Sequence, residues 1–183
     1  MTRLFVALEL PALVKQHLLM MAGGVPGARW LEADQMHLTL RFIGEVDGAV
    51  MADVTAALGS VEAEPFEVTL AGVGHFPPRG TPRTLWVGVA DNPKLVGLRT
   101  RIESALACTG VGRDSRKFFA HVALARLKEP KMSKVAEFLS RHALFRLDAF
   151  KVDAFCLLSS MLGSRGAIHR VEVEFPLTEK GDL

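Results

Sequence analysis

The chain of 183 residues is 49% hydrophobic, 23% charged and 7% aromatic, and its net charge at pH 7 is +2. This composition is typical of a globular protein with enough apolar material for a core, and it excludes a disordered chain, a collagen-like repeat and a disulfide-stapled mini-protein. A charge so close to zero also excludes a protein that coats nucleic acid through its phosphates, although it permits a local basic pocket. No apolar run approaches the ~20 residues of a membrane span, and residues 1–9 lack a secretory apolar region, so we expect a cytoplasmic protein.

Hydrophobic periodicity predicts strands and helices mixed along the whole chain. In the first half, the expected elements are a strand over 3–10, a helix that begins at Pro11, a strand over 36–43, a helix over 49–61 and strands over 66–73 and 83–90. In the second half, they are a helix that begins at Pro93, a strand over 118–127, a helix over 133–141 and strands over 145–158 and 167–175. The Pro- and Gly-rich segment 74–80 indicates an antiparallel hairpin, so an α+β fold is favoured over a parallel doubly wound sheet.

The sequence carries no pattern for a metal or a nucleotide cofactor. Cys108 and Cys156 stand alone, without a second cysteine or a histidine at metal-ligand spacing, and are expected to be small buried hydrophobes. The glycines of residues 72–74 lack the spacing of a phosphate-binding loop. We therefore expect no metal site and no cofactor.

The strand over 36–43 carries the first group of candidate functional residues. Side chains alternate across a strand, so His37, Thr39 and Arg41 are expected on one face. The other face would then hold the core residues, which are Leu38, Leu40 and Phe42. An imidazole, a hydroxyl and a guanidinium would look outward together.

The strand over 118–127 has a sequence around His121 that is similar to the sequence around His37. Alternation places His121 and Ala123 on one face, opposite the apolar Val122 and Leu124. Strict alternation puts Arg126 on the core face, so this arginine reaches His121 only if the strand ends or bulges between them. The sequence leaves this point open.

Two imidazoles suit the cleavage of a phosphodiester without a metal. One histidine near its natural pKa can act as general base and the other as general acid. A hydroxyl can donate to phosphate oxygens, and an arginine can neutralise their charge. Either strand alone is a weak signal, because a surface histidine beside a strand-favouring threonine is the plainer interpretation.

Taken together, the two strands resemble the paired His-x-Thr-x signatures of the two-histidine phosphoesterases. The segments that carry the resemblance are 37–46 and 121–126, with further similarity at 3–11, 83–89 and 159–166. The branch they resemble most is that of the RNA 2′,3′-cyclic phosphodiesterases, also called 2′-5′ RNA ligase-like proteins. The resemblance covers nearly the whole chain.

The resemblance implies a bilobal α+β fold over residues 1–183, a single domain with two pseudo-symmetric lobes. Their antiparallel sheets would line a central cleft, with the helices outside. The implied activity is metal-independent hydrolysis of RNA or nucleotide 2′,3′-cyclic phosphate ends to 2′-phosphomonoesters, with 2′-5′ ligation as a minor reverse reaction. The implied partners are such RNA ends or small cyclic nucleotides, with no membrane, and we expect a monomer.

By the same resemblance, His37 and His121 are the catalytic acid–base pair, and Thr39 and Arg126 bind the phosphate. The sequence does not decide which histidine is the acid; the assignment we favour has His121 activating water and His37 protonating the leaving 3′ oxygen. Arg41 is a further candidate for the pocket wall.

Two residues depart from the family pattern, and both are expected in the pocket. Ala123 stands where the second motif has threonine, and His169 stands where the family has a tyrosine, a residue type that this chain lacks entirely. Because a phosphate-facing hydroxyl is missing, a second hypothesis is a module that binds phosphorylated RNA ends or nucleotides with weakened or no turnover. A third is a scaffold whose cleft is unused.

Overall fold

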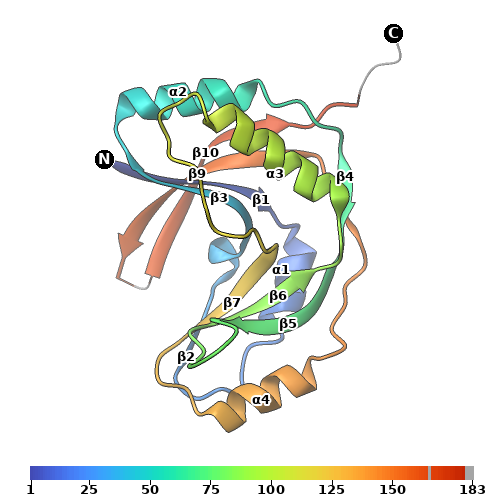
Figure 1. Ribbon diagram of the computed structural model, residues 1–183. Helices are drawn as coiled ribbons and strands as arrows, with labels where there is room; N and C mark the ends of the chain where they lie inside the picture. Colours follow the sequence, from blue (N-terminus) through green and yellow to red (C-terminus); the bar gives the residue numbers. More distant parts are fainter. Residues whose placement is uncertain (165, 180–183) are drawn as a thin grey trace.

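The computed structural model describes residues 1–164 and 166–179 and confirms the α+β class (Figure 1). The helices are α1 (Ala12–Leu19), the short 3₁₀ helix η1 (Ala33–Gln35), α2 (Gly48–Gly59), α3 (Pro93–Leu106) and α4 (Met132–Arg141). The strands are β1 (Thr2–Glu9), β2 (Ala28–Trp30), β3 (His37–Val46), β4 (Phe66–Val68), β5 (Leu70–Phe76), β6 (Thr84–Val89), β7 (His121–Leu127), β8 (Phe150–Val152), β9 (Ala154–Gly163) and β10 (Gly166–Pro176).

The main sheet is built from two halves that meet at the histidine strands. Its order is β10-β9-β1-β3-β7-β6-β5, with β2 paired to β7, and the pairs are antiparallel. The halves join where Leu38 of β3 lies opposite Val122 of β7. This order brings the His37 and His121 strands side by side, although the two residues are far apart in the sequence.

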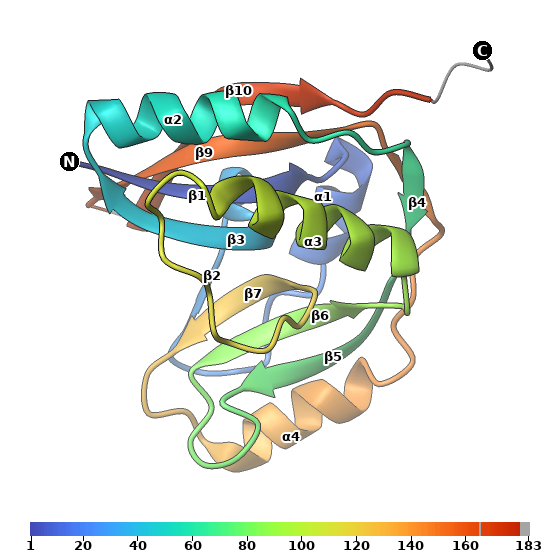
Figure 2. The same ribbon diagram turned by 45° about the horizontal axis from the view of Figure 1, so that its top comes forward.

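Helices cover the outer side of each half (Figure 2). Helices α2 and α3 lie over the β1–β3–β9–β10 half, and α4 lies against the β5–β6–β7 half. The polar residues before the helices fix where they begin: the Asp47 carboxylate accepts a hydrogen bond from the Val50 N–H, and the Asn92 side chain accepts one from Leu95 N–H. Pro93 then supplies the backbone angle of the first turn of α3.

The core follows the periodic apolar positions of these elements. Helix α3 buries Leu95, Leu98, Ile102 and Leu106 at helical spacing, in the same core cluster as the fully buried Leu38 of β3. Burial of such a stripe is what stabilises a helix of this length, at about 25 cal/mol per Å² of apolar surface.

Several sequence-based expectations about elements were wrong in detail. The single strand expected over 66–73 is two strands, β4 and β5, which pair with β8 and β6. The segment 74–80 is not all loop, because β5 continues through His75 to Phe76 in pairing with β6. The single strand expected over 145–158 is two strands, β8 and β9, which pair with different partners. Strand β2 and helix η1 were not predicted, since elements of three residues leave no measurable periodicity.

The two cysteines differ in environment. Cys156 is buried as expected, and burial raises the pKa of its thiol to about 12. Cys108 was expected to be buried too, but it is exposed just after the end of α3. Both are free thiols in the structure.

Candidate active site

A β-bulge in β3 decides which side chains of the first histidine strand face the cleft. Ala7 of β1 lies opposite Thr39, and the next residue, Val6, lies opposite Arg41, so Leu40 is an extra residue on β3. An extra residue reverses the alternation of side chains beyond it. His37 and Thr39 therefore face the cleft as predicted, whereas beyond the bulge Phe42 faces it and Arg41 does not.

A bulge at the corresponding position of β7 settles the open question about Arg126. Leu85 of β6 lies opposite Ala125, and the next residue, Trp86, lies opposite Ala123, so Leu124 is the extra residue. Leu124 and Ala125 are both buried, and Arg126 returns to the face of His121.

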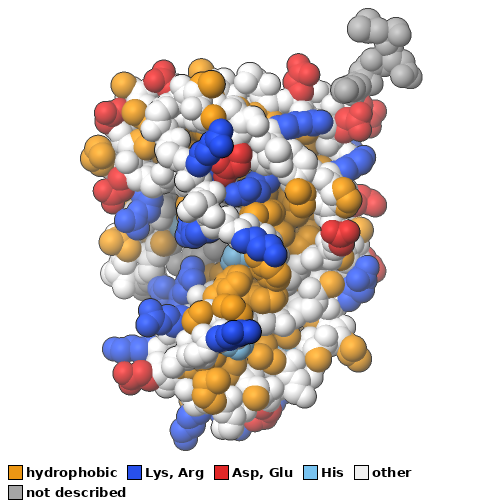
Figure 3. All heavy atoms as spheres, in the orientation of Figure 1, with side chains coloured by type: hydrophobic (Ala, Val, Ile, Leu, Met, Phe, Trp, Pro, Cys, Tyr) orange, Lys and Arg blue, Asp and Glu red, His pale blue; other side chains and the backbone are white. Residues whose placement is uncertain are grey.

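The two bulged strands and β10 bring six of the predicted residues to one pocket of about 240 Å³. They are His37, Thr39, His121, Ala123, Arg126 and His169. The strands are pseudo-equivalent: His37 matches His121, Thr39 matches Ala123, and Phe42 stands where the second strand has Arg126. Figure 3 shows this side of the molecule hollowed, with arginine and lysine side chains beside the hollow.

His121 is held by a backbone carbonyl and by aromatic rings. Its Nδ1 donates to the Phe119 carbonyl oxygen at 2.7 Å, which leaves Nε2 unprotonated in the neutral ring. Phe76 packs edge-on at 4.9 Å between ring centroids, and Phe119 and Trp86 complete the wall. Burial lowers the pKa of His121, so the imidazole is neutral at pH 7 and able to accept a proton.

His37 has a carboxylate partner instead. Its Nε2 lies 2.8 Å from Oε1 of Glu9, which is directly opposite it on β1. The hydrogen bond from His37 lowers the pKa of the Glu9 carboxyl, so Glu9 is ionised at neutral pH. An ionised carboxylate is the natural partner of an imidazolium, and the two histidines therefore sit in electrostatically different surroundings.

The remaining predicted residues occupy different sides of the pocket. Arg126 donates from Nη1 to the Thr84 hydroxyl at 2.8 Å, which orients its guanidinium. Ala123 presents a methyl group where the matching strand presents the Thr39 hydroxyl. His169 of β10 packs edge-on against His37, with ring centroids 5.2 Å apart, and against Phe5 at 5.0 Å.

Arg41 is the predicted pocket residue that the structure places elsewhere. It is 5% exposed and points toward α3, where its Nε lies 2.8 Å from Oε1 of Glu103. It also donates to the carbonyl oxygen of Gly112, so it ties the loop after α3 to β3. The expectation was wrong because it assumed unbroken alternation through Leu40.

We expect Arg41→Met to lower the free energy of unfolding by about 3 kcal/mol, because it removes one partner of a buried ion pair and a backbone contact. Urea denaturation measures this change. Arg99→Met is the matched control, since Arg99 pairs with the same Glu103 oxygen at 3.2 Å from a less buried position, and it should cost less. Unchanged stability together with a raised KM would show instead that Arg41 contacts substrate.

Several pocket residues were missed by the sequence reasoning. They are Arg3, Phe5, Arg29, Leu31, Gln35, Phe42, Ser160 and Ala167. Most come from β1, β2, η1 and the β9–β10 hairpin, whose proximity to the histidine strands follows from sheet order. The resemblance at residues 3–11 and 159–166 was the available signal, but it singled out no residue there.

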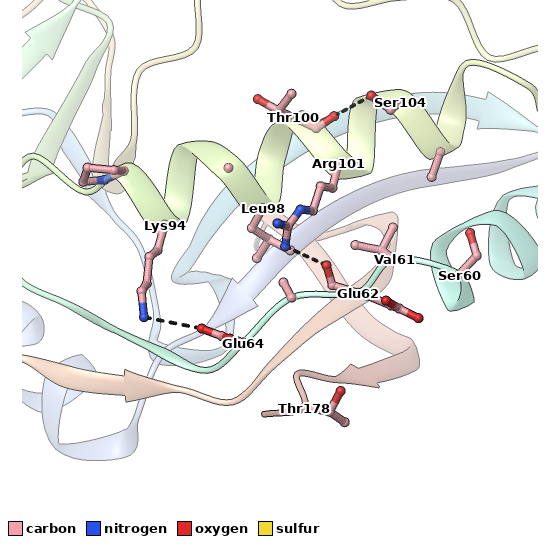
Figure 4. Close-up of a pocket in the computed structure, with 14 residues that line it drawn as sticks. Ser60, Val61, Glu62, Glu64, Lys94, Leu98, Thr100, Arg101, Ser104 and Thr178 are labelled. Carbon is pink, nitrogen blue, oxygen red and sulfur yellow. Dashed lines mark hydrogen bonds and ion pairs between the residues drawn. The ribbon is translucent and has the colours of Figure 1, made fainter. Parts of the chain in front are cut away.

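A larger groove lies away from the histidines (Figure 4). It has a volume of about 1060 Å³ and runs between α3 and the segment 60–64. Two of its cations have partners: Arg101 donates to the carbonyl oxygen of Glu62, and Lys94 lies 3.9 Å from Glu64. The residues described as lining it include no histidine or cysteine, so the smaller pocket is the candidate for chemistry.

The structure of residues 1–164 and 166–179 bears on metals and membranes. No group of three or more His, Cys, Asp or Glu side chains lies together in a way that could hold a metal ion. Within the same residues, no helix has the length and apolar character to cross a membrane.

Comparison with known proteins gives consistent matches. The model of the LigT-like phosphoesterase family matches residues 8–86. The RNA 2′,3′-cyclic phosphodiesterase of Archaeoglobus fulgidus is 32% identical over 171 residues, which are 92% of this chain and 96% of that protein. The RNA 2′,3′-cyclic phosphodiesterase of Aeropyrum pernix is 32% identical over 160 residues, 86% of this chain and 90% of that protein.

Solved structures share the fold over nearly the full length. TT0787 of Thermus thermophilus superposes with a TM-score of 0.79 at 25% identity and covers 96% of this chain and 97% of its own. LigT of E. coli, solved in complex with 3′-AMP, superposes with a TM-score of 0.80 at 24% identity and covers 97% of this chain and 99% of its own.

Proposed function

Because the chain belongs to the LigT-like phosphoesterase family, we propose that it is an RNA 2′,3′-cyclic phosphodiesterase that opens cyclic phosphate ends to 2′-phosphomonoesters. The proposal takes its substrate class from relatives of matching length, which carry that name. The observation that supports it most is the shared pocket lined by His37, His121, Thr39 and Arg126.

The two histidines divide the proton transfers. The Nε2 of neutral His121 takes a proton from water, whose oxygen attacks the phosphorus of the cyclic phosphate. The bond from phosphorus to the 3′ oxygen breaks, and protonated His37 gives its proton to that oxygen. The products are a 2′-phosphomonoester and a free 3′-hydroxyl. Proton exchange with solvent then returns both histidines to their starting forms.

The lowered pKa of His121 and the carboxylate beside His37 support this assignment of base and acid. When His37 protonates the leaving 3′ oxygen, its Nε2–H can stay hydrogen-bonded to Glu9 while its Nδ1–H donates the proton. If a 5′-hydroxyl takes the place of the attacking water, the same step joins two RNA ends through a 2′-5′ linkage, which would be a minor ligation.

Thr39 and Arg126 stabilise the charge that develops on the phosphate. The Thr39 hydroxyl donates to one non-bridging oxygen, and the Arg126 guanidinium neutralises another. Because Arg126 is oriented by the Thr84 hydroxyl, it needs little reorganisation when the substrate binds.

The first test is hydrolysis of an oligoribonucleotide with a 2′,3′-cyclic phosphate end, in the presence of EDTA. We expect turnover that is unaffected by the chelator and products that end in a 2′-phosphate. Loss of activity with EDTA that added metal restores would overturn metal independence, and a 3′-phosphate product would overturn the identity of the leaving oxygen.

The second candidate function is a binding module for phosphorylated RNA ends or nucleotides, and Ala123 is the observation that favours it. It predicts affinity for a 2′-phosphate end, weakened by salt and by Arg126→Ala, without hydrolysis above background. Turnover that disappears with His37→Ala would exclude it.

A further inference from the structure

Two arginines stand side by side in the pocket. Arg29 of β2 lies directly opposite Arg126 of β7, and both line the pocket that holds the two histidines. Residues directly opposite each other on an antiparallel pair have Cβ atoms about 5 Å apart and share a face of the sheet. The two guanidinium groups therefore enter the pocket from the same side.

This pairing concentrates positive charge on one side of the pocket. Like charges directly opposite each other destabilise a sheet. Burial, followed by the charge of Arg29, lowers the pKa of Arg126, which reports the same repulsion. Arg3 also lines the pocket, where it is paired with Glu45 at 3.2 Å, and the residues described as lining the pocket include no Asp or Glu. The pocket therefore favours a ligand with more than one negative charge.

The end of the β9–β10 hairpin passes close to the Arg29 side chain. Gly166 has a φ of 128°, and a Cβ on it would lie 2.4 Å from Nη1 of Arg29 and 2.8 Å from Nε2 of Gln35. The Gln35 amide donates to the carbonyl oxygen of Ala167 at 2.9 Å and so holds the hairpin against η1. The positive φ at this position favours glycine.

Arg29 stands at the same level along β7 as Arg126, one strand to the side of it. Strand β2 pairs with residues 125–127 at one end of β7, whereas His121 begins the strand at its other end. In Figure 1, β2 lies beside the end of β7 that is remote from β3 and α3. The Arg126 guanidinium is bonded to Thr84 of β6, whereas Arg29 projects from β2 on the other side of β7, so a ligand that meets both extends across β7.

We propose that Arg29 binds a second phosphate of the substrate, the phosphodiester on the 5′ side of the terminal nucleotide. The inference rests on the proposed function, in which Arg126 holds the cyclic phosphate. That group carries one negative charge, which one guanidinium neutralises, and the next phosphate of an RNA chain matches the second guanidinium. The substrate class is then an oligonucleotide end rather than a free cyclic mononucleotide.

The test compares three substrates with Arg29→Gln: a 2′,3′-cyclic mononucleotide, a dinucleotide with the same cyclic end, and that dinucleotide with an uncharged methylphosphonate linkage. We expect the variant to raise KM for the charged dinucleotide about tenfold or more, since a charge-assisted hydrogen bond is lost. KM for the other two substrates should stay near the wild-type value. The salt dependence of log KM for the charged dinucleotide should become shallower by ~0.7.

Arg170→Gln is the matched control, because Arg170 is an exposed neighbour of His169 that does not line the pocket. It makes the same change in charge and should alter none of the three KM values. An equal rise in KM on the mononucleotide would assign Arg29 to the cyclic phosphate and overturn the proposal, as would no change on any substrate.

Failure of the proposed function has a different signature. If the wild type hydrolyses none of the substrates, binding of a dinucleotide and a mononucleotide that each end in a 2′-phosphate still tests Arg29. We then expect the wild type to bind the dinucleotide more tightly and Arg29→Gln to lose that preference. Equal affinity of the wild type for both ligands would overturn the proposal by itself.

Discussion

Replacing His121 with Asn is expected to lower kcat on a cyclic-phosphate oligonucleotide by about 10²–10⁴-fold. Asn keeps a polar group near the Phe119 carbonyl, which accepts from Nδ1 of His121 at 2.7 Å, but it has no nitrogen that takes up a proton at neutral pH. KM should change far less than kcat, since the proton transfer occurs in the chemical step rather than in binding. Steady-state kinetics with and without the substitution measure both quantities.

The pH profile separates the two histidines. The base must be neutral, so kcat/KM falls as the pH drops through the pKa of His121, and burial places that acid limb below pH 6.5. We expect His121→Asn to remove the acid limb from its residual activity. His37→Asn should cost a similar factor in kcat and leave the acid limb in place.

The control for these variants is His142→Asn, which changes a histidine at the end of α4, away from the pocket. It should leave kcat and the profile unchanged. If either variant retains wild-type kcat, the two-histidine mechanism is wrong, and if His37→Asn removes the acid limb instead, the roles of the histidines are exchanged.

Replacing Ala123 with Thr is expected to raise kcat by about 10²-fold. Removal of one oxyanion donor in other enzymes costs ~10²–10³-fold, and Ala123 occupies the position on β7 that Thr39 occupies on β3. The Trp86 ring beside Ala123 is directed toward β5, since a Cβ on Gly74 would come within 2.3 Å of it. The new hydroxyl can therefore enter the pocket beside His121.

Ala123→Val is the matched control, because it adds the same bulk without a hydroxyl and should not raise kcat. The variant Thr39→Ala should lower kcat by a factor similar to the gain. Activity in Ala123→Thr from an inactive wild type would identify the natural protein as a binding module. A fall in kcat with both Thr and Val would show that the pocket needs the small residue for substrate to fit.

The sequence predicted the family of the protein better than it predicted which side chains line the pocket. The local sequences around His37 and His121 predicted a pair of histidine strands. The family resemblance based on them is confirmed by relatives that match over most of the chain. Helices α2, α3 and α4 were predicted because their apolar spacing or first-turn residues, such as Pro93, are local signals. Local patterns are readable from sequence because residues within a turn or strand determine them directly.

Which residues enter the pocket was decided by the tertiary structure. Both histidine strands bulge, at Leu40 and at Leu124, and these bulges move Arg41 out of the cleft and Arg126 into it. A bulge depends on the register with the neighbouring strand, which comes from a distant part of the chain, so alternation within one strand cannot reveal it. The Arg29–Arg126 pair has the same origin, because β2 reaches β7 only through the folded sheet. The sequence by itself therefore determined the family and the fold class, and the packing of remote strands determined which side chains line the pocket.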